Sequence, residues 1–231
     1  MKINPNARVR VETVLGEIPV LFVEDFYEDP DAVRAQALGV DYDITAALYP
    51  GRHAILATPE SRAVVTALCQ LLTDLGDQVY DPDECSADFS IVVTKAKDLL
   101  AGQKHPHIDP TPVLGIVYLN PVNGAGTSFY YNKVLGTALV RNQQDRDGLA
   151  EFHRTLAREH EPEGYSLENH PCWERVYTIE GRYNRLVVYP GNVFHAVDIT
   201  TIPAQFSMDT VRLTQRFIPQ RCTPKRVPAD N

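Results

Sequence analysis

The first third of the chain alternates between apolar segments and polar turns, and this pattern predicts two strands followed by two helices. Short apolar runs at 9–14 and 18–23 flank a Leu-Gly-Glu turn, which indicates a strand pair. An Asp-Pro pair precedes an apolar pattern at 30–38, and a Thr-Pro pair begins a longer helical pattern at 59–75. A glycine follows each helical pattern, where helices commonly end. We expect both helices to support a sheet.

From residue 88 onward, the spacing of apolar residues becomes the one expected for short strands. These segments are rich in β-branched and aromatic residues and are separated by Gly, Pro or Asn. The expected strands are 89–94, 114–119, 127–131, 176–179, 185–189 and 211–218. This rhythm is typical of an antiparallel sandwich or jelly roll. The fold class we expect is therefore mainly β with flanking helices (α+β).

A length of 231 residues suits one compact domain, within which three parts can be distinguished. Residues 1–87 should form N-terminal strands and support helices packed on a core at 88–219. Within that core, the highly charged segment 142–171 has only a short amphipathic pattern, so we interpret it as an insertion over one end of the barrel. Residues 220–231 are expected to be a loose tail.

Composition narrows the possible partners and the compartment. A formal net charge of −8 argues against a nucleic-acid backbone or an anionic membrane surface as partner. No apolar run is long enough to span a membrane, and the first residues do not have the pattern of a signal peptide. The four cysteines include no Cys-x-x-Cys pair, so we expect reduced thiols in a cytoplasmic protein.

Three residues form a candidate metal site: His107, Asp109 and His195. Two imidazoles and a carboxylate are the ligand set that binds a non-haem Fe(II) and leaves other coordination positions open. Residues i and i+2 of an extended segment point to the same side, so His107 and Asp109 can bind one ion together. The third ligand, His195, lies 86 positions beyond Asp109 in a strand pattern. His105 has the wrong spacing and is expected to support a ligand or to be exposed.

The surroundings of these residues resemble a known family. The ordered segments are His-Pro-His-Ile-Asp-Pro at 105–110, Leu-Gly-Ile-Val-Tyr-Leu-Asn at 114–120, Gly-Thr-Ser-Phe at 126–129, an apolar stretch with the distal histidine at 185–197, and Arg-Leu-Thr at 212–214. Over about 88–219 this series resembles the Fe(II)- and 2-oxoglutarate-dependent oxygenases, particularly the prolyl-hydroxylase-like branch. The resemblance implies a double-stranded β-helix, which is a jelly roll, with the metal near one mouth.

The resemblance also implies roles for single residues. The metal ligands would be those named above, Arg212 would bind the far carboxylate of 2-oxoglutarate, and Thr214 matches the hydroxyl residue two places on. Tyr118 matches a tyrosine that contacts the same carboxylate in some members. Arg212 follows His195 by 17 positions, a longer gap than is usual in the family, and Arg216 shares its strand face. The choice between the two arginines stays open, with Arg212 preferred; the other should face solvent or pair with a protein acid.

The implied function is a dioxygenase that uses Fe(II), 2-oxoglutarate and O2 to hydroxylate a small molecule or a protein side chain. Halogenating members replace the carboxylate ligand by a small residue, so Asp109 favours oxygen insertion or desaturation over chlorination. Asn120 and Tyr131, with Tyr130 and Asn132, could line the substrate pocket, although sheet packing explains them equally well. One alternative is a non-catalytic metal-binding jelly roll, such as a sensor or scaffold. Another, a purely structural sandwich, is disfavoured by the complete ligand set with its arginine.

Overall fold

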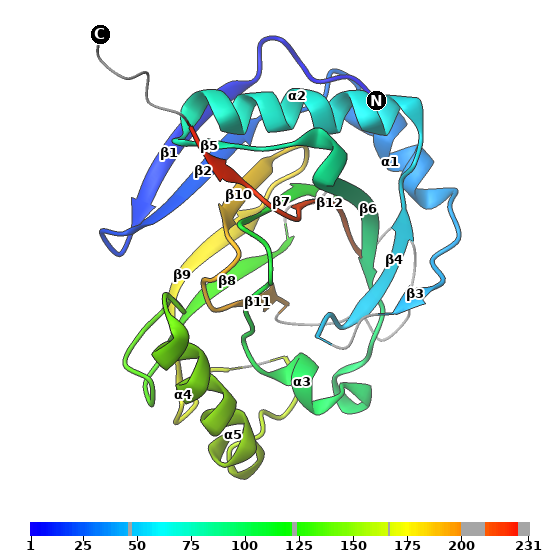
Figure 1. The fold of residues 1–231 in the computed structure, drawn as a ribbon. Helices are drawn as coiled ribbons and strands as arrows, with labels where there is room; N and C mark the ends of the chain where they lie inside the picture. Colours follow the sequence, from blue (N-terminus) through cyan, green and yellow to red (C-terminus); the bar gives the residue numbers. More distant parts are fainter. Residues whose placement is uncertain (46–47, 122–123, 166, 200–210, 226–231) are drawn as a thin grey trace, which may run out of the picture.

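Two antiparallel sheets face each other in the computed structural model, which describes residues 1–45, 48–121, 124–165, 167–199 and 211–225 (Figure 1). The large sheet contains, in spatial order, β1 (Arg8–Val14), β2 (Ile18–Glu24), β10 (Leu186–Pro190), β7 (Val113–Tyr118), β12 (Arg212–Pro219), β6 (Cys85–Val92), β4 (Gly51–Ile55) and β3 (Ile44–Thr45). The small sheet contains β11 (His195–Asp198), β8 (Gly124–Asn132) and β9 (Trp173–Gly181).

The core strands follow the path of a long hairpin that coils between the two sheets. At its tip β8 pairs with β9, and further along the arms β7 pairs with β10. Next, His107 forms an antiparallel bridge with His195 at the edge of the small sheet. The arms end where β6 pairs with β12 in the large sheet. This alternation is a double-stranded β-helix, so the predicted jelly roll is confirmed.

Two apolar layers hold the large sheet in place. On its inner face, Phe22 and Tyr189 pack in one apolar cluster with Phe129 of the small sheet, and all three side chains are almost fully buried. Its outer face packs under α1 (Pro30–Leu38) and α2 (Pro59–Leu75), where Leu68 and Phe217 are buried. Removing such a side chain from water contributes about 1.5–3 kcal/mol each, so both layers stabilise the barrel.

Both support helices form where the sequence predicts them, because capping side chains define their first turns. The side chain of Asp29 accepts a hydrogen bond from Ala32 N at 2.9 Å at the start of α1. At the start of α2, Thr58 and Ser61 bond each other's backbone N–H groups at 3.2 and 3.1 Å, which is a reciprocal capping box. No helix among the described residues is long and apolar enough to cross a membrane.

The insertion at 142–171 forms two helices instead of one, α4 (Gln143–Arg154) and α5 (Leu156–Glu159). They lie against the outer face of the small sheet, in the lower part of Figure 1. Phe152 of α4 packs edge to face on Trp173, with ring centroids 5.5 Å apart. The insertion is therefore attached to the barrel by its own apolar cluster.

Some elements were not predicted from the sequence. The first 87 residues add β3 and β4 to the large sheet beside β6, so they continue the sheet as well as supporting it. Short helical turns precede the metal-site segment: η1 (Pro82–Glu84), η2 (Ala96–Asp98) and α3 (Ala101–Lys104). The expectation of a loose tail is wrong for Thr223 and Pro224, which form β13 and pair with β5 (Gln78–Val79). All four cysteines are free thiols, as expected.

Candidate metal centre and its pocket

The structure brings the three predicted ligands together at one end of the barrel. His107 and His195 exchange both backbone hydrogen bonds, each 2.9 Å long, which places their rings side by side with centroids 4.6 Å apart. Asp109 N donates to Gly191 O at 2.8 Å, so the same segment turns back over the strand that carries His195. One potential ligand atom from each side chain lies within 4.8 Å of the other two.

Hydrogen bonds and burial prepare these groups for a cation. Nδ1 of His195 donates a hydrogen bond to Val193 O at 2.9 Å, which orients the ring so that Nε2 lies 3.3 Å from Asp109 Oδ2. Burial, and then the neighbouring His195, lower the pKa of His107 to about 4, so its imidazole is neutral at pH 7.

The carboxylate of Asp109 is ionised. Burial alone would raise its pKa, but the hydrogen bond from His195 and the charges of His195, His107 and Arg216 together hold the pKa below its usual range. Two imidazoles and one carboxylate suit a divalent first-row metal ion. The donor set therefore fits the metal that the sequence implies.

A glycine keeps the ligand segment close to its support. A Cβ on Gly191 would collide with Thr111 O and would lie 3.0 Å from Asp109 O, both of which are backbone atoms. Thr111 is itself held, because its hydroxyl donates to Val113 O at 2.9 Å and also contacts Pro219 O. The carboxylate ligand is thus positioned by backbone packing on two strands.

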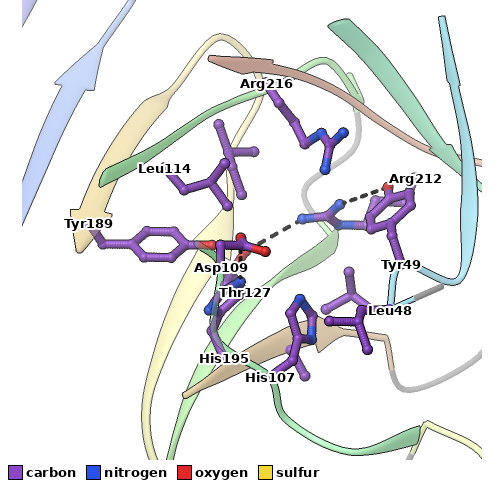
Figure 2. Close-up of a pocket in the computed structure, with 13 residues that line it drawn as sticks. Leu48, Tyr49, His107, Asp109, Leu114, Thr127, Tyr189, His195, Arg212 and Arg216 are labelled. Atoms are coloured by element: carbon purple, nitrogen blue, oxygen red, sulfur yellow. Dashed lines mark hydrogen bonds and ion pairs between the residues drawn. The ribbon is translucent and has the colours of Figure 1, made fainter. Parts of the chain in front are cut away.

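A pocket of about 290 Å3 lies beside the three ligands, between the two sheets (Figure 2). Arg212 and Arg216 of β12 form one wall, opposite the metal ligands, and Tyr189 closes a third side. Leu48 and Tyr49, which precede β4, border the pocket near His107 and Arg212. Most of the remaining lining is apolar.

The two arginines of the pocket differ in their partners. Arg216 makes a bidentate ion pair with Asp88, with N–O distances of 2.9 and 2.6 Å, and this meets the expectation that one arginine pairs with a protein acid. Arg212, which is 6% exposed, reaches only neutral oxygens: Ala125 O at 3.2 Å, Gly126 O at 3.1 Å and the hydroxyls of two side chains. Within the described part of the chain, no carboxylate forms an ion pair with Arg212.

Two of the residues that the family resemblance implied lie beside the pocket and do not line it. The hydroxyl of Tyr118 bonds Thr127 Oγ1 at 2.9 Å, and Thr127 is the residue that faces the pocket. Thr214 sits between the two arginines on β12, fully buried, and its hydroxyl has no hydrogen-bond partner. Tyr118 therefore contacts the pocket indirectly, through Thr127 and through Arg212, whose guanidinium carbon lies 5.6 Å from the centroid of its ring.

Asn120 and Tyr131, the two candidates for a substrate pocket, do not line this pocket. The side chain of Asn120 binds Val211 O at 2.5 Å and Leu213 N at 2.9 Å, which fixes the start of β12. Tyr131 packs at the margin of the core between the sheets. Both residues have the structural roles that we weighed as the alternative.

His105 links the metal-site segment to the insertion. Its Nδ1 accepts from Trp173 Nε1 at 3.1 Å and its Nε2 donates to Ala157 O at 3.0 Å. Burial lowers its pKa to about 4, so it is a neutral, fully bonded histidine. No described residue of the insertion lines the pocket, so these residues lie behind the metal ligands, outside the barrel.

Three functional candidates have no clear signal in the sequence: Asp88, Tyr49 and Tyr189. Tyr189 carries a buried hydroxyl without any hydrogen-bond partner, in a side chain that lines the pocket. Alternation along 185–189 places this ring inside the barrel, but alternation cannot tell how close it lies to the metal end.

Comparison with known proteins places the chain in a family. The model of a family of unknown function, DUF6445, matches residues 5–217. The chain belongs to this family. None of the curated proteins matches it.

Solved structures with a similar fold are non-haem 2-oxoglutarate-dependent enzymes. The epimerase SnoN from nogalamycin biosynthesis shares 13% identity over 90% of this chain and 79% of its own, with a TM-score of 0.50. The carbocyclase SnoK of the same biosynthesis shares 14% over 89% and 81%, with a TM-score of 0.46. HygX from Streptomyces hygroscopicus, solved with nickel and 2-oxoglutarate, shares 14% over 92% and 87%, with a TM-score of 0.45. The likeness to SnoN agrees with the jelly roll described above.

Proposed function

We propose that this protein is an Fe(II)- and 2-oxoglutarate-dependent dioxygenase that oxidises a C–H bond of its substrate. One observation carries the proposal: a His, Asp, His constellation faces, across a single pocket, a buried arginine that pairs with no acid among the described residues. An arginine with a purely structural role would be expected to form an ion pair with a protein carboxylate. An anionic co-substrate that also ligates the metal accounts for both sides of the pocket at once.

His107, Asp109 and His195 are the residues that would hold the iron. When bound there, iron and 2-oxoglutarate supply the oxidising chemistry by using O2 and releasing succinate and CO2. The protein keeps the imidazole of His107 neutral, holds the carboxylate ionised and surrounds the site with apolar side chains. Because Asp109 occupies the position that halogenating relatives leave open, hydroxylation or desaturation is the expected reaction.

Arg212 is the residue that would bind the far carboxylate of 2-oxoglutarate. Its contacts with carbonyl and hydroxyl oxygens orient the guanidinium but do not neutralise it, and a buried unpaired charge is costly. A carboxylate can accept two parallel hydrogen bonds from such a group. Arg216 already makes this bidentate contact with Asp88, so its guanidinium is paired with a protein carboxylate.

The direct test combines binding and turnover. Purified protein is loaded anaerobically with Fe(II), 2-oxoglutarate is titrated while the visible absorption of the metal–oxo-acid complex is followed, and succinate is measured after O2 is admitted. Asp109→Ala should lose most iron affinity, because a hard anionic ligand is removed. Arg212→Met should keep iron and lose 2-oxoglutarate affinity, whereas Arg182→Met on the surface should change neither.

Three results would each contradict a different part of the proposal. Iron binding with no 2-oxoglutarate complex and no succinate would indicate a non-catalytic metal-binding jelly roll. Normal iron content in Asp109→Ala would show that this carboxylate is not a ligand. Chlorinated product from the wild-type protein would contradict the expected reaction type.

A further inference from the structure

The first strand of the large sheet presents an unusually open edge. β1 pairs along all seven of its residues with β2, in a regular antiparallel register, and no described strand lies on its other side. In Figure 1 it forms one outer border of the large sheet, and β3 lies at the opposite border. Val9 and Val11 are 45% and 57% exposed, although valine in a strand is normally half-covered.

Few of the features that normally protect a sheet edge are present in β1. Proteins prevent edge pairing with very short strands, prolines, bulges or charged side chains, lysine above all. β1 is seven residues long, regular and free of proline and lysine, and its charges are of both signs, whereas the opposite edge strand, β3, is only two residues long. An edge of this kind is suited to accept a further strand through backbone hydrogen bonds.

The charges along β1 select one partner and one register. In an antiparallel pairing of the strand with itself, Arg10 faces Glu12 twice when Val11 is opposite Val11. If the centre of the symmetric pairing moves by one residue, like charges face each other. Arg10 then lies opposite Arg10, or Glu12 opposite Glu12. Only the Val11-centred register joins opposite charges and avoids like charges, and it adds an apolar contact at its centre.

We propose that β1 is a dimerisation strand that pairs antiparallel with β1 of a second copy of this chain, centred on Val11. The two large sheets would then form one continuous sheet across a two-fold axis, which is the common symmetry of homodimers. The pocket is lined from β7, β10 and β12, so it lies away from this edge and both copies keep an open site.

The two charged side chains are ordered by contacts within one copy of the chain. They form an ion pair with each other, the guanidinium of Arg10 lies 3.8 Å from the ring centroid of Phe22, and Glu12 accepts a hydrogen bond from Tyr177 OH at 2.6 Å. Side chains that are already ordered lose little conformational entropy when a partner binds. The edge is therefore preorganised.

The first experiment measures the mass of the full chain by sedimentation and light scattering over a wide concentration range. Wild type should be a dimer whose Kd rises by about tenfold or more in Glu12→Arg and in Arg10→Glu, because each change places like charges opposite each other twice. The double variant Arg10→Glu with Glu12→Arg restores opposite charges and should restore the dimer. A chain that is monomeric throughout, or a dimer insensitive to these charges, overturns the proposal.

A cysteine pair tests the register. Val11→Cys should form a disulfide-linked dimer under mild oxidation, because facing Cβ atoms in such a pair are about 4.5–5.5 Å apart. The matched control is Val9→Cys on the same face; two such residues would be offset by four positions, about 13 Å, and should not cross-link. Equal cross-linking of both variants contradicts the Val11-centred register. These measurements need neither metal nor substrate, so their outcome is separate from that of the proposed activity.

Discussion

Replacing Asp88 should destabilise the protein much more than replacing a partner of a surface ion pair. Asp88 and Arg216 are directly opposite each other on β6 and β12, and their side chains are 12% and 18% exposed. Asp88→Leu would leave the guanidinium of Arg216 in the pocket wall without its bidentate partner. The same argument applies in reverse to Arg216→Met, which leaves a buried carboxylate.

The magnitude follows from the burial of the pair. Breaking a buried ion pair by removing one partner costs about 3–5 kcal/mol, because the remaining charge is uncompensated. Arg216 borders the pocket and can be partly solvated there, so we expect the lower end, about 3 kcal/mol. The double variant Asp88→Leu with Arg216→Met removes both charges and should cost less than either single change. The coupling free energy between the two positions should then exceed about 2 kcal/mol.

Urea unfolding followed by fluorescence of the single tryptophan, Trp173, measures all four proteins of this cycle. The control is Arg182→Met, which removes an ion pair with Glu180 whose side chains are 53% and 48% exposed. Such an exposed pair contributes less than about 1 kcal/mol. If each single change at Asp88 or Arg216 costs no more than this control, or if the two costs simply add, the pair is not the buried ionic contact described here.

Three further predictions concern pH, a hydroxyl and a glycine. Burial holds the pKa of His53 and of His105 at about 4 in the folded protein, below the usual 6.5, so the unfolded chain binds more protons between these values. The contribution of each histidine to the free energy of unfolding should therefore be fully present above about pH 6.5 and should decrease by up to about 3 kcal/mol as pH drops towards 4. Urea unfolding at several pH values measures this decrease, and His105→Asn should make the dependence of the free energy on pH less steep. Tyr189→Phe removes a buried hydroxyl with no partner and should not destabilise, whereas Tyr118→Phe loses a hydrogen bond and about 1 kcal/mol; urea midpoints in the opposite order would refute this. Gly191→Ala should reduce metal affinity, measured by calorimetry with Ni(II), while circular dichroism stays unchanged, because the new Cβ displaces the segment that carries the carboxylate ligand; unaltered affinity would show that this close approach does not position the ligand.

Most helices and strands could be predicted because the residues that determine them lie close together in the sequence. Capping residues and apolar spacing predicted both support helices, and strand alternation predicted the core strands to within a few residues. Alternation also placed His107 beside Asp109 without knowledge of the fold. β3 and β4 were missed because they are short and lie at a sheet edge, where one side is not buried and apolar alternation is weak.

What the sequence could not predict depends on the register between distant strands. The partner of Arg216 is 128 positions away, and only the pairing of β6 with β12 places Asp88 opposite it. Tyr118 and Tyr189 both point between the sheets, so alternation does not distinguish them. Tyr189 is level with Leu114 across β7 and β10, near the metal end, whereas Tyr118 is four residues further along β7, about 13 Å deeper.

The bridge between His107 and His195 has a consequence for how the proposed metal ion would enter the protein. The two ligands are 88 positions apart, yet their backbones are hydrogen-bonded to each other, so the donor set exists only after both arms of the coiled hairpin have closed. An isolated His-x-Asp segment cannot capture a cation and nucleate folding around it, as the ligands of a zinc finger do. On the proposed function, the ion would instead enter a site that is already folded. Removal of the ion should then abolish activity without unfolding the protein, and the identity of the bound ion would be decided by which metals are free around the folded chain.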